Sequence, residues 1–414
     1  MNSRILPGFV VLFACSRPAI EVAESVAVRD SAGVQILEHL AGSEERLPKW
    51  MVAEAPLLDI GEGDGPGQDL YQVGGAVRLG DGRIVVVNRG SNELRFFDST
   101  GAYLFAAGRQ GQGPGEFASL GTIQLLPGDS LFALDPQLRR GSLFAPTGEF
   151  VRSMTTGQRA DLEAGRVQGY TYAIALLDQG RLLGESRLFT EMKKTSGPVR
   201  RDTFALVFLD PDGSSADTIA VIPGGEVFPA LGHEGGHSFP TIHSLEFGRQ
   251  TVVAIDRERI YVGTNEPDGI RVYSSNGKLI RKIRSASPAE LVTAEHRETR
   301  MREALARIDR QRGSEQVKAE WRKNQENARY AEVFPFYERL LIGTDGALWV
   351  ERARRYEDEG RRFIVYDSTG RAIATVSCPE RVRPYHVGPA EIIGLWRDPD
   401  EVPHVRVYKV RGER

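Results

Sequence analysis

Cysteine and long apolar runs are scarce in this sequence of 414 residues. Its two cysteines, Cys15 and Cys378, form no Cys-x-x-Cys motif, and no spacing typical of a zinc site is present. No stretch of the chain reaches the roughly 20 apolar residues of a membrane-spanning helix, which excludes a polytopic membrane protein. The formal net charge of −3 excludes a strongly basic nucleic-acid binder, so we expect no nucleic-acid partner.

Glycine and proline are abundant, with 45 and 22 residues, against only 5 methionines. This balance predicts many turns and few long helices. Hydrophobic residues make up 41% of the chain and charged residues 26%, which excludes a disordered polymer. The length implies one large repetitive domain or two domains of medium size.

The N-terminus has the pattern of an export signal. Arg4 is followed by an apolar run over residues 5–14, which is too short to span a bilayer. Leu12-Phe13-Ala14-Cys15 resembles a bacterial lipobox, in which the cysteine receives the lipid and becomes the first mature residue. We therefore expect a signal over residues 1–15, lipid attachment at Cys15, and a tether with an N-terminal extension over residues 16–49. The predicted location is the cell envelope, or outside the cell if the lipid is absent.

A unit of about 47 residues recurs along the chain, and such periods indicate repeat architectures. Residues 81–101, DGRIVVVNRGSNELRFFDSTG, and residues 128–148, GDSLFALDPQLRRGSLFAPTG, each read as strand, polar turn, strand and glycine turn. Further copies close at Gly277 and Gly370, and a stretched copy closes at Gly213. Four-stranded units of this length are typical of β-propeller blades.

Six such units fit the sequence, and the last one lacks its fourth strand. The segment PLLDIG at residues 56–61 is a spare strand at the other end of the chain. Pairing the two leaves no sheet edge exposed. The predicted fold is therefore an all-β, six-bladed propeller over residues 50–414, closed by an N-terminal strand. Two separate β-sandwiches are the alternative.

The glycine-rich run GRQGQGPGEF at residues 108–117, the DG-x-I-x-V strand at 81–86 and the F-D-x-x-G turns identify a family resemblance. The chain resembles the six-bladed propellers of NHL-repeat character found in bacterial exported proteins and lipoproteins. This resemblance covers roughly residues 50–410 and implies a fold without implying an activity, because propellers host many functions.

One insertion, residues 287–331, interrupts the repeat. Ser287-Pro288-Ala289-Glu290 reads as a capping box with proline at the first helical position. Apolar residues recur at helical spacing on both sides of Gly313. We expect a helical hairpin, either as a solvated cover on the propeller or as a docking element.

Acids and amides recur at the end of the second strand of each unit. Because a ring of oxygen ligands suits a hard cation, these residues are candidates for a Ca²⁺ or ligand site at the channel mouth. Sugar-lactone hydrolases and related propeller enzymes hold a metal in this way. Capping of the adjacent turns is the competing interpretation. The candidates are Asn88, Asp135, Glu185, Asn265, Glu351 and Asp398.

Three of the seven histidines, His233, His237 and His243, lie close together in the sequence. The first two fit the metallopeptidase pattern H-E-x-x-H, which requires a helix. Gly235 and Gly236 make a helix improbable, so only a weak metal site on a loop is predicted.

No sequence motif of a nucleophilic enzyme is present. The leading hypothesis is a non-catalytic, membrane-tethered propeller that binds an envelope protein, a peptide or a glycan, with the long turn at 186–202 and the insertion flanking the site. The alternative is a metal-dependent hydrolase or lyase acting on a small ester or sugar lactone. A third possibility is a structural module of a surface assembly.

Overall fold

The computed structural model describes residues 25–412 with short gaps, so Cys15 lies outside the described residues. The gaps are residues 64, 162–167, 178–179, 190–195, 211–214, 267–268, 312 and 356–357.

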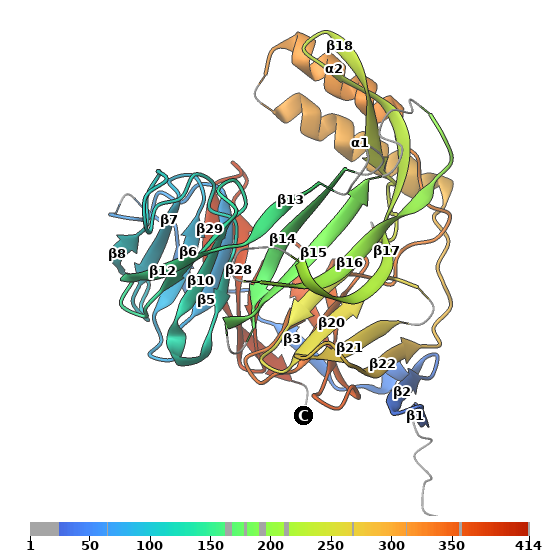
Figure 1. Cartoon of the computed structure of the whole chain (residues 1–414), viewed down its shortest axis with the longest axis horizontal. Coiled ribbons are helices and arrows are strands. Elements are labelled where there is room, and N and C mark those ends of the chain that lie inside the picture. Colours follow the sequence, from blue (N-terminus) through green and yellow to red (C-terminus); the bar gives the residue numbers. More distant parts are fainter. Residues whose placement is uncertain are drawn as a thin grey trace, which may run out of the picture.

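Two four-stranded antiparallel sheets follow one another in the first part of the chain (Figure 1). In both, the strands pair in the order in which they occur in the sequence, as in the blades of a propeller. The first contains β5 (Val73–Arg78), β6 (Ile84–Asn88), β7 (Glu93–Phe97) and β8 (Tyr103–Ala107). The second contains β9 (Ile123–Leu125), β10 (Leu131–Asp135), β11 (Arg140–Phe144) and β12 (Phe150–Thr155), with a short 3-10 turn, η2 (Pro127–Asp129), between β9 and β10.

The third sheet is enlarged to six strands, and its strands are longer. It contains β13 (Gly157–Asp161), β14 (Gln168–Leu176), β15 (Leu182–Phe189), β16 (Arg200–Leu209), β17 (Ser215–Glu234) and β18 (His237–Ser244), in that order. The predicted turn at 186–202 is therefore partly wrong, because β15 and β16 occupy both of its ends. The 20-residue strand β17 was also not predicted.

The fourth sheet carries an N-terminal hairpin on its outer edge. Its core strands are β19 (Val252–Ile255), β20 (Arg259–Gly263), β21 (Ile270–Ser274) and β22 (Leu279–Ser285). The hairpin consists of β1 (Val26–Ser31) and β2 (Val34–His39), and β2 pairs in parallel with β22. This N-terminal hairpin thus joins a sheet whose other strands lie in the middle of the chain.

The last two sets of four strands are joined into one nine-stranded sheet by β3 (Lys49–Val52), which pairs with both β26 and β29. The strands before the junction are β23 (Tyr337–Ile342), β24 (Leu348–Arg352), β25 (Gly360–Tyr366) and β26 (Ala372–Pro379). Those after it are β27 (Arg383–Val387), β28 (Glu391–Arg397) and β29 (Pro403–Gly412), completed by β4 (Leu58–Ile60). A 3-10 turn, η1 (Ser43–Arg46), precedes β3.

Two of the glycine turns that define the repeat, at Gly101 and Gly370, are held by the same side-chain interaction. Oδ1 of Asp98 accepts hydrogen bonds from the backbone N–H groups of Thr100 and Ala102. Gly101 supplies the left-handed conformation that closes the turn, with φ of 86°. Asp367 and Gly370 repeat this arrangement after β25, which explains the recurrence of D-S-T-G in the sequence.

Neighbouring sheets pack through apolar clusters. The β5–β8 strands pack on β10 and β11, and β10 packs on β14–β16. From there the contacts pass through β19–β22 and β23–β25 to β27–β29. Ile60 of β4 and Val405 of β29 then pack on Ile84 and Phe97 of the first sheet. The mostly β chain with successive curved sheets in mutual contact has the architecture of a β-propeller.

The pairing of β4 with β29 joins residues from the two ends of the chain. Asp59 of β4 accepts hydrogen bonds from His404 (2.8 Å) and from Arg406 (2.6 Å), both on β29. The guanidinium of Arg406 stacks 3.3 Å from the ring centre of Trp396 on β28. The spare strand identified in the sequence therefore pairs with the last strand and carries a nearly buried acid between two basic partners.

Two helices, α1 (Ala294–Arg310) and α2 (Glu315–Glu326), lie where the sequence predicts a helical hairpin. The predicted start of the first helix is wrong by six residues. Thr293 is the N-cap, and its side chain accepts a hydrogen bond from the N–H of His296 while His296 Nδ1 accepts one from Thr293. Glu290 instead forms an ion pair with Arg355, so the Ser287–Glu290 spacing matched a capping box by coincidence.

Replacing Asp59 by Asn should lower the free energy of unfolding by about 2 kcal/mol, because a nearly buried carboxylate that accepts hydrogen bonds from Arg406 and His404 becomes a neutral amide. Urea unfolding of the two proteins measures the difference. Glu54→Gln, an exposed change of the same kind on the segment between β3 and β4, is the control. Equal destabilisation by both changes would mean that Asp59 has no special part in holding β4.

Candidate functional site

Five of the six candidate ring residues are buried, and Asp398 is half-buried. Asn88 ends β6, and its Oδ1 accepts a hydrogen bond from Tyr71 N at 2.7 Å. Asp135 ends β10, and one of its oxygens accepts from the N–H groups of Ala118 and Ser119. Both side chains thus bind the segment that leads into their own sheet, which is the turn-capping interpretation.

The other candidates are also engaged by protein groups. Asn265 bonds main-chain atoms of Gln250 and Tyr337, and Glu351 lies between Arg339 and Arg361. Glu185 accepts a hydrogen bond from the hydroxyl of Tyr172. Asp398 closes the turn after β28 by accepting from Val402 N. The structure places five of these residues at or next to the end of a strand, whereas Glu185 lies inside β15, and the oxygens of all six bind protein groups.

The segment around the three histidines is a β-hairpin, where the sequence indicated a loop. His233 pairs with Ser238 across the two strands, with Gly235 and Gly236 forming the turn at positive φ. Because side chains alternate along a strand, His233 lies on one face of the hairpin and His237 and His243 on the other. In the described part of the chain, no group of three or more His, Cys, Asp or Glu side chains is arranged to hold a metal ion.

A readable signal for this hairpin is present in the sequence. Gly-Gly between two runs of alternating residues is a strong hairpin signal, because both turn positions need positive φ. The sequence interpretation used Gly235 and Gly236 only as an argument against a helix, although the same pair predicts a hairpin turn.

We call residues 226–244, the outer part of β17 together with β18, the hairpin arm. The arm and the two helices project beyond the other sheets at the top of Figure 1. Glu320 of α2 accepts hydrogen bonds from the turn N–H groups of Gly235 and Gly236. The side-chain amide of Asn324 bonds both the N–H and the C=O of His233. The tip of the arm is therefore fixed to α2 by hydrogen bonds between side chains of the helix and the backbone of the arm.

At its base the arm begins at a bulge in β17. The register with β16 shifts where Gly224 and Gly225 are inserted between the partners of Arg201 and Thr203. Bulges leave backbone groups without ladder partners. The guanidinium of Arg201 donates to two carbonyl oxygens at the bulge. Its Nε bonds Gly224 O at 2.8 Å, and its Nη2 bonds Pro223 O. It reaches the fourth sheet as well, through Thr264 O at 2.9 Å.

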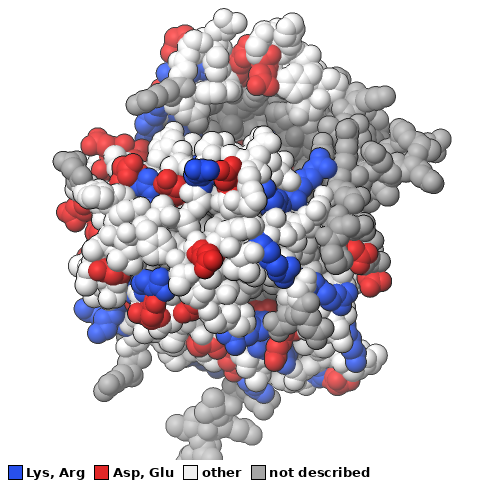
Figure 2. Space-filling model, turned by 60° about the vertical axis from the view of Figure 1, so that its left-hand side comes forward, with Lys and Arg blue, Asp and Glu red and all other residues white. Residues whose placement is uncertain are grey.

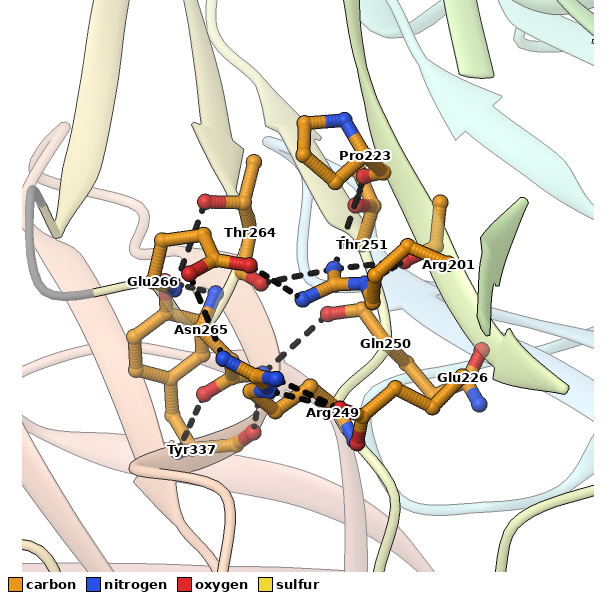
Figure 3. A network of polar contacts seen from close by, with 11 residues as sticks. Arg201, Pro223, Glu226, Arg249, Gln250, Thr251, Thr264, Asn265, Glu266 and Tyr337 are labelled. Carbon is orange, nitrogen blue, oxygen red and sulfur yellow. Dashed lines mark hydrogen bonds and ion pairs between the residues drawn. The ribbon is translucent and has the colours of Figure 1, made fainter. Parts of the chain in front are cut away.

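Four charged side chains meet beside this bulge, as Figure 3 shows. Glu266 binds both Arg201 (2.7 Å) and Arg249 (3.2 Å), and Glu226 binds Arg249 at 2.6 Å. Burial lowers the pKa of Arg201, while the hydrogen bonds that Arg249 donates to Glu226 raise the pKa of Arg249. Both guanidiniums remain charged, because an arginine does not lose its proton in a protein. The two positive and two negative charges cancel, so this cluster connects elements without attracting an ion of either sign.

A pocket of about 170 Å³ lies next to the cluster, at the base of the arm. Its wall combines hydroxyl and amide groups with three apolar side chains, Phe204, Val227 and Ile242. Pockets that bury a drug-sized ligand are about 300–1,000 Å³, so this one is suited to a single side chain or one small ring. The remaining lining residues are Asp202, Thr203, Gly224, Gly225, Ser244, Gln250 and Thr251.

The surface shown in Figure 2 carries basic and acidic side chains in alternation, without a large area of one sign. Such a surface gives no electrostatic attraction to a polyanion. Of the helices that the structure describes, neither α1 nor α2 has the length and apolar character needed to cross a membrane.

The arrangement of sheets defines a protein of the β-propeller class, and comparison with known proteins agrees. Residues 68–140 match the model of the DUF5128 family, described as a 6-bladed beta-propeller. The matched residues are well under half of the chain. No curated protein matches the chain by sequence.

Solved structures with a similar course of the chain include two from Bacteroides. One, from Bacteroides fragilis and described as exported, is 12% identical over 92% of this chain and 100% of its own, with a TM-score of 0.44. A DUF4221 family member from Bacteroides vulgatus is 12% identical over 88% and 99%, with a TM-score of 0.47. A calcium-binding regucalcin from Agrobacterium tumefaciens is 10% identical over 88% and 97%, with a TM-score of 0.36.

Replacing Arg201 by Met should destabilise the protein by about 3 kcal/mol, because carbonyls at the bulge lose their donor and Glu266 loses a cation. Hydrogen exchange should accelerate most in residues 226–250, since the arm is held at its base by this side chain. Arg139→Met, at an exposed position, is the matched control. Unchanged exchange in the arm would show that Arg201 does not hold it.

Proposed function

We propose that this protein is an exported six-bladed propeller, closed by β4, that acts as a non-catalytic scaffold for binding another molecule at the envelope. The observation that carries this proposal is the hairpin arm. It is fixed at its tip by Glu320 and Asn324 and at its base by Arg201, and a pocket opens beside it. A rigid projection with a pocket at its base is suited to recognition, because binding then costs little ordering entropy.

The six-bladed interpretation is supported by the order of strand pairing and by the family match. In this interpretation, the ring is completed by the pairing of Asp59 and its neighbours with β29. The catalytic alternative receives less support from the site geometry. The buried acids that it requires as metal ligands already accept hydrogen bonds from backbone N–H groups or lie between arginines.

We also propose that Cys15 is the point of lipid attachment. Growth of a bacterial expression host with an alkyne-tagged fatty acid should label the wild-type protein and place it in the membrane fraction. Cys15→Ser should abolish the label and release the protein, because the acyl chains would be its only membrane contact. Cys378→Ser is the control, since this buried thiol is not available for acylation. Labelling of the Cys15→Ser variant would contradict the proposal.

The helices should be removable without loss of the propeller. Val292 N bonds Glu332 O and Phe334 N bonds Glu290 O, so the two ends of the insertion lie side by side. A short Gly/Ser linker in place of residues 294–328 should preserve the strand signal in circular dichroism and a cooperative melt. The same change should abolish cross-linking to envelope components, because α2 holds the arm.

The double variant Glu320→Ala with Asn324→Ala is the finer test, because it keeps both helices and releases only the tip of the arm. We expect it to weaken cross-linking while thermal melting stays near that of the wild type. If the linker variant does not fold, the helices are structural. If it cross-links as the wild type does, the arm is not the binding element.

A further inference from the structure

The outer edges of the two strands of the hairpin arm differ in how far their backbone N–H and C=O groups are protected. In an antiparallel hairpin, alternate residues turn their N–H and C=O groups outward. Glu234 and His237 flank the two-residue turn and therefore form a hydrogen-bonded pair within the hairpin. Because the pattern alternates, the even-numbered residues of β18 turn their N–H and C=O groups outward. Glu246, just beyond β18, confirms this parity, because its N–H and C=O bond Arg329 O and Ala331 N.

The outer edge of β17 is protected near its tip and at its base. His233 is an outward position of β17, and the amide of Asn324 occupies both of its backbone groups. Nearer the base, β16 pairs with β17 as far as Val227. This is the usual treatment of an edge strand, whose free N–H and C=O groups would otherwise pair with another chain.

The outer edge of β18 is protected at only some positions. Pro240 occupies an outward position and has no backbone N–H, so an added strand cannot accept a hydrogen bond there. Glu246 is already paired with the short segment at Arg329–Ala331. Between them lie Ile242 and Ser244, and within the described residues no hydrogen bond to their outward N–H or C=O groups is seen.

The unpaired stretch lies directly beside the pocket. Ile242 and Ser244 line it together with Val227, the cross-strand partner of Ser244. A strand added along Ile242–Ser244 would place every second side chain on this face. The adjacent charges of Arg201, Arg249, Glu226 and Glu266 neutralise one another, and Asp202, the charged residue in the lining, has a partner of its own, which favours an uncharged side chain in the pocket.

We propose that the outer edge of β18 at Ile242–Ser244 binds an extended peptide segment of a partner protein by strand addition, with one small, uncharged side chain of that segment in the pocket. The same edge already forms one isolated parallel bridge within this chain, between Glu246 and Tyr330, so the added segment would lie next to an existing pairing. This inference rests on the proposed scaffold function and assigns it a ligand class, a polypeptide, and a site.

The test uses a phage-displayed library of random heptapeptides selected on the immobilised full chain. The selected peptides should show a preference at alternate positions, and a synthetic copy should protect Ile242–Ser244 from hydrogen exchange. Ser244→Pro removes one outward N–H without breaking the bonds to β17, and should weaken binding by about tenfold or more. Ser238→Pro is the matched control, an outward position beyond Pro240 that should leave binding unchanged.

N-methylation of the peptide tests the same pairing on the unmodified protein, so the result does not depend on the folding of a variant. Methylation at every second amide should abolish binding, whereas methylation at the intervening amides should not. Equal effects at both sets would overturn strand addition. Selection of no peptide, or protection elsewhere on the protein, would also overturn it.

The scaffold proposal has a separate readout. Cross-linking of an envelope component that persists in Ser244→Pro and is lost when residues 294–328 are replaced would leave the scaffold intact and refute the edge site. Cross-linking that survives both changes would refute the two proposals together.

Discussion

Backbone groups at the edges of sheets are the constraint on which most of this structure depends. A strand at an edge presents N–H and C=O groups that need partners or protection. The chain uses its N-terminal segment several times to meet this need: β2 covers the edge of β22, β3 joins two sets of strands, and β4 completes β29. Strands of residues 26–60 are therefore an integral part of the sheets, although the sequence predicts a tether with an N-terminal extension as far as residue 49.

The same constraint explains the polar side chains that the sequence offered as a ligand ring. Asn88 and Asp135 lie at strand ends, where main-chain donors of the incoming segment lack ladder partners. Their oxygens accept hydrogen bonds from those donors, and Arg201 in turn donates hydrogen bonds to carbonyls at the bulge. An acid or amide that recurs at corresponding strand ends follows from the need to bind the same main-chain donors in each sheet. By itself it is weak evidence for a metal site.

Much of the fold was predictable from the sequence because the repeat is local. The D-S-T-G turns fix hairpins through Asp98 and Asp367, and PLLDIG is correctly paired with the last strand. The hairpin arm was missed because its strands are interrupted by Pro223, Pro229 and Pro240, which read as loop. The start of α1 was misplaced because Ser287 and Thr293 both fit an N-cap, and only packing of His296 against Phe334 distinguishes them. The cluster of Arg201 with Glu266 joins residues 65 positions apart, and no local pattern encodes such a meeting.

The bond between His404 and Asp59 spans 345 positions of the chain. Strand β4 is synthesised long before β29, the strand with which it pairs. The strand pairs of the intervening sheets can form locally in the meantime, whereas the last sheet stays incomplete, since pairings of such separation form late and slowly. A chain truncated before residue 405 would therefore leave β4 without its partner strand, however well the intervening sheets had formed.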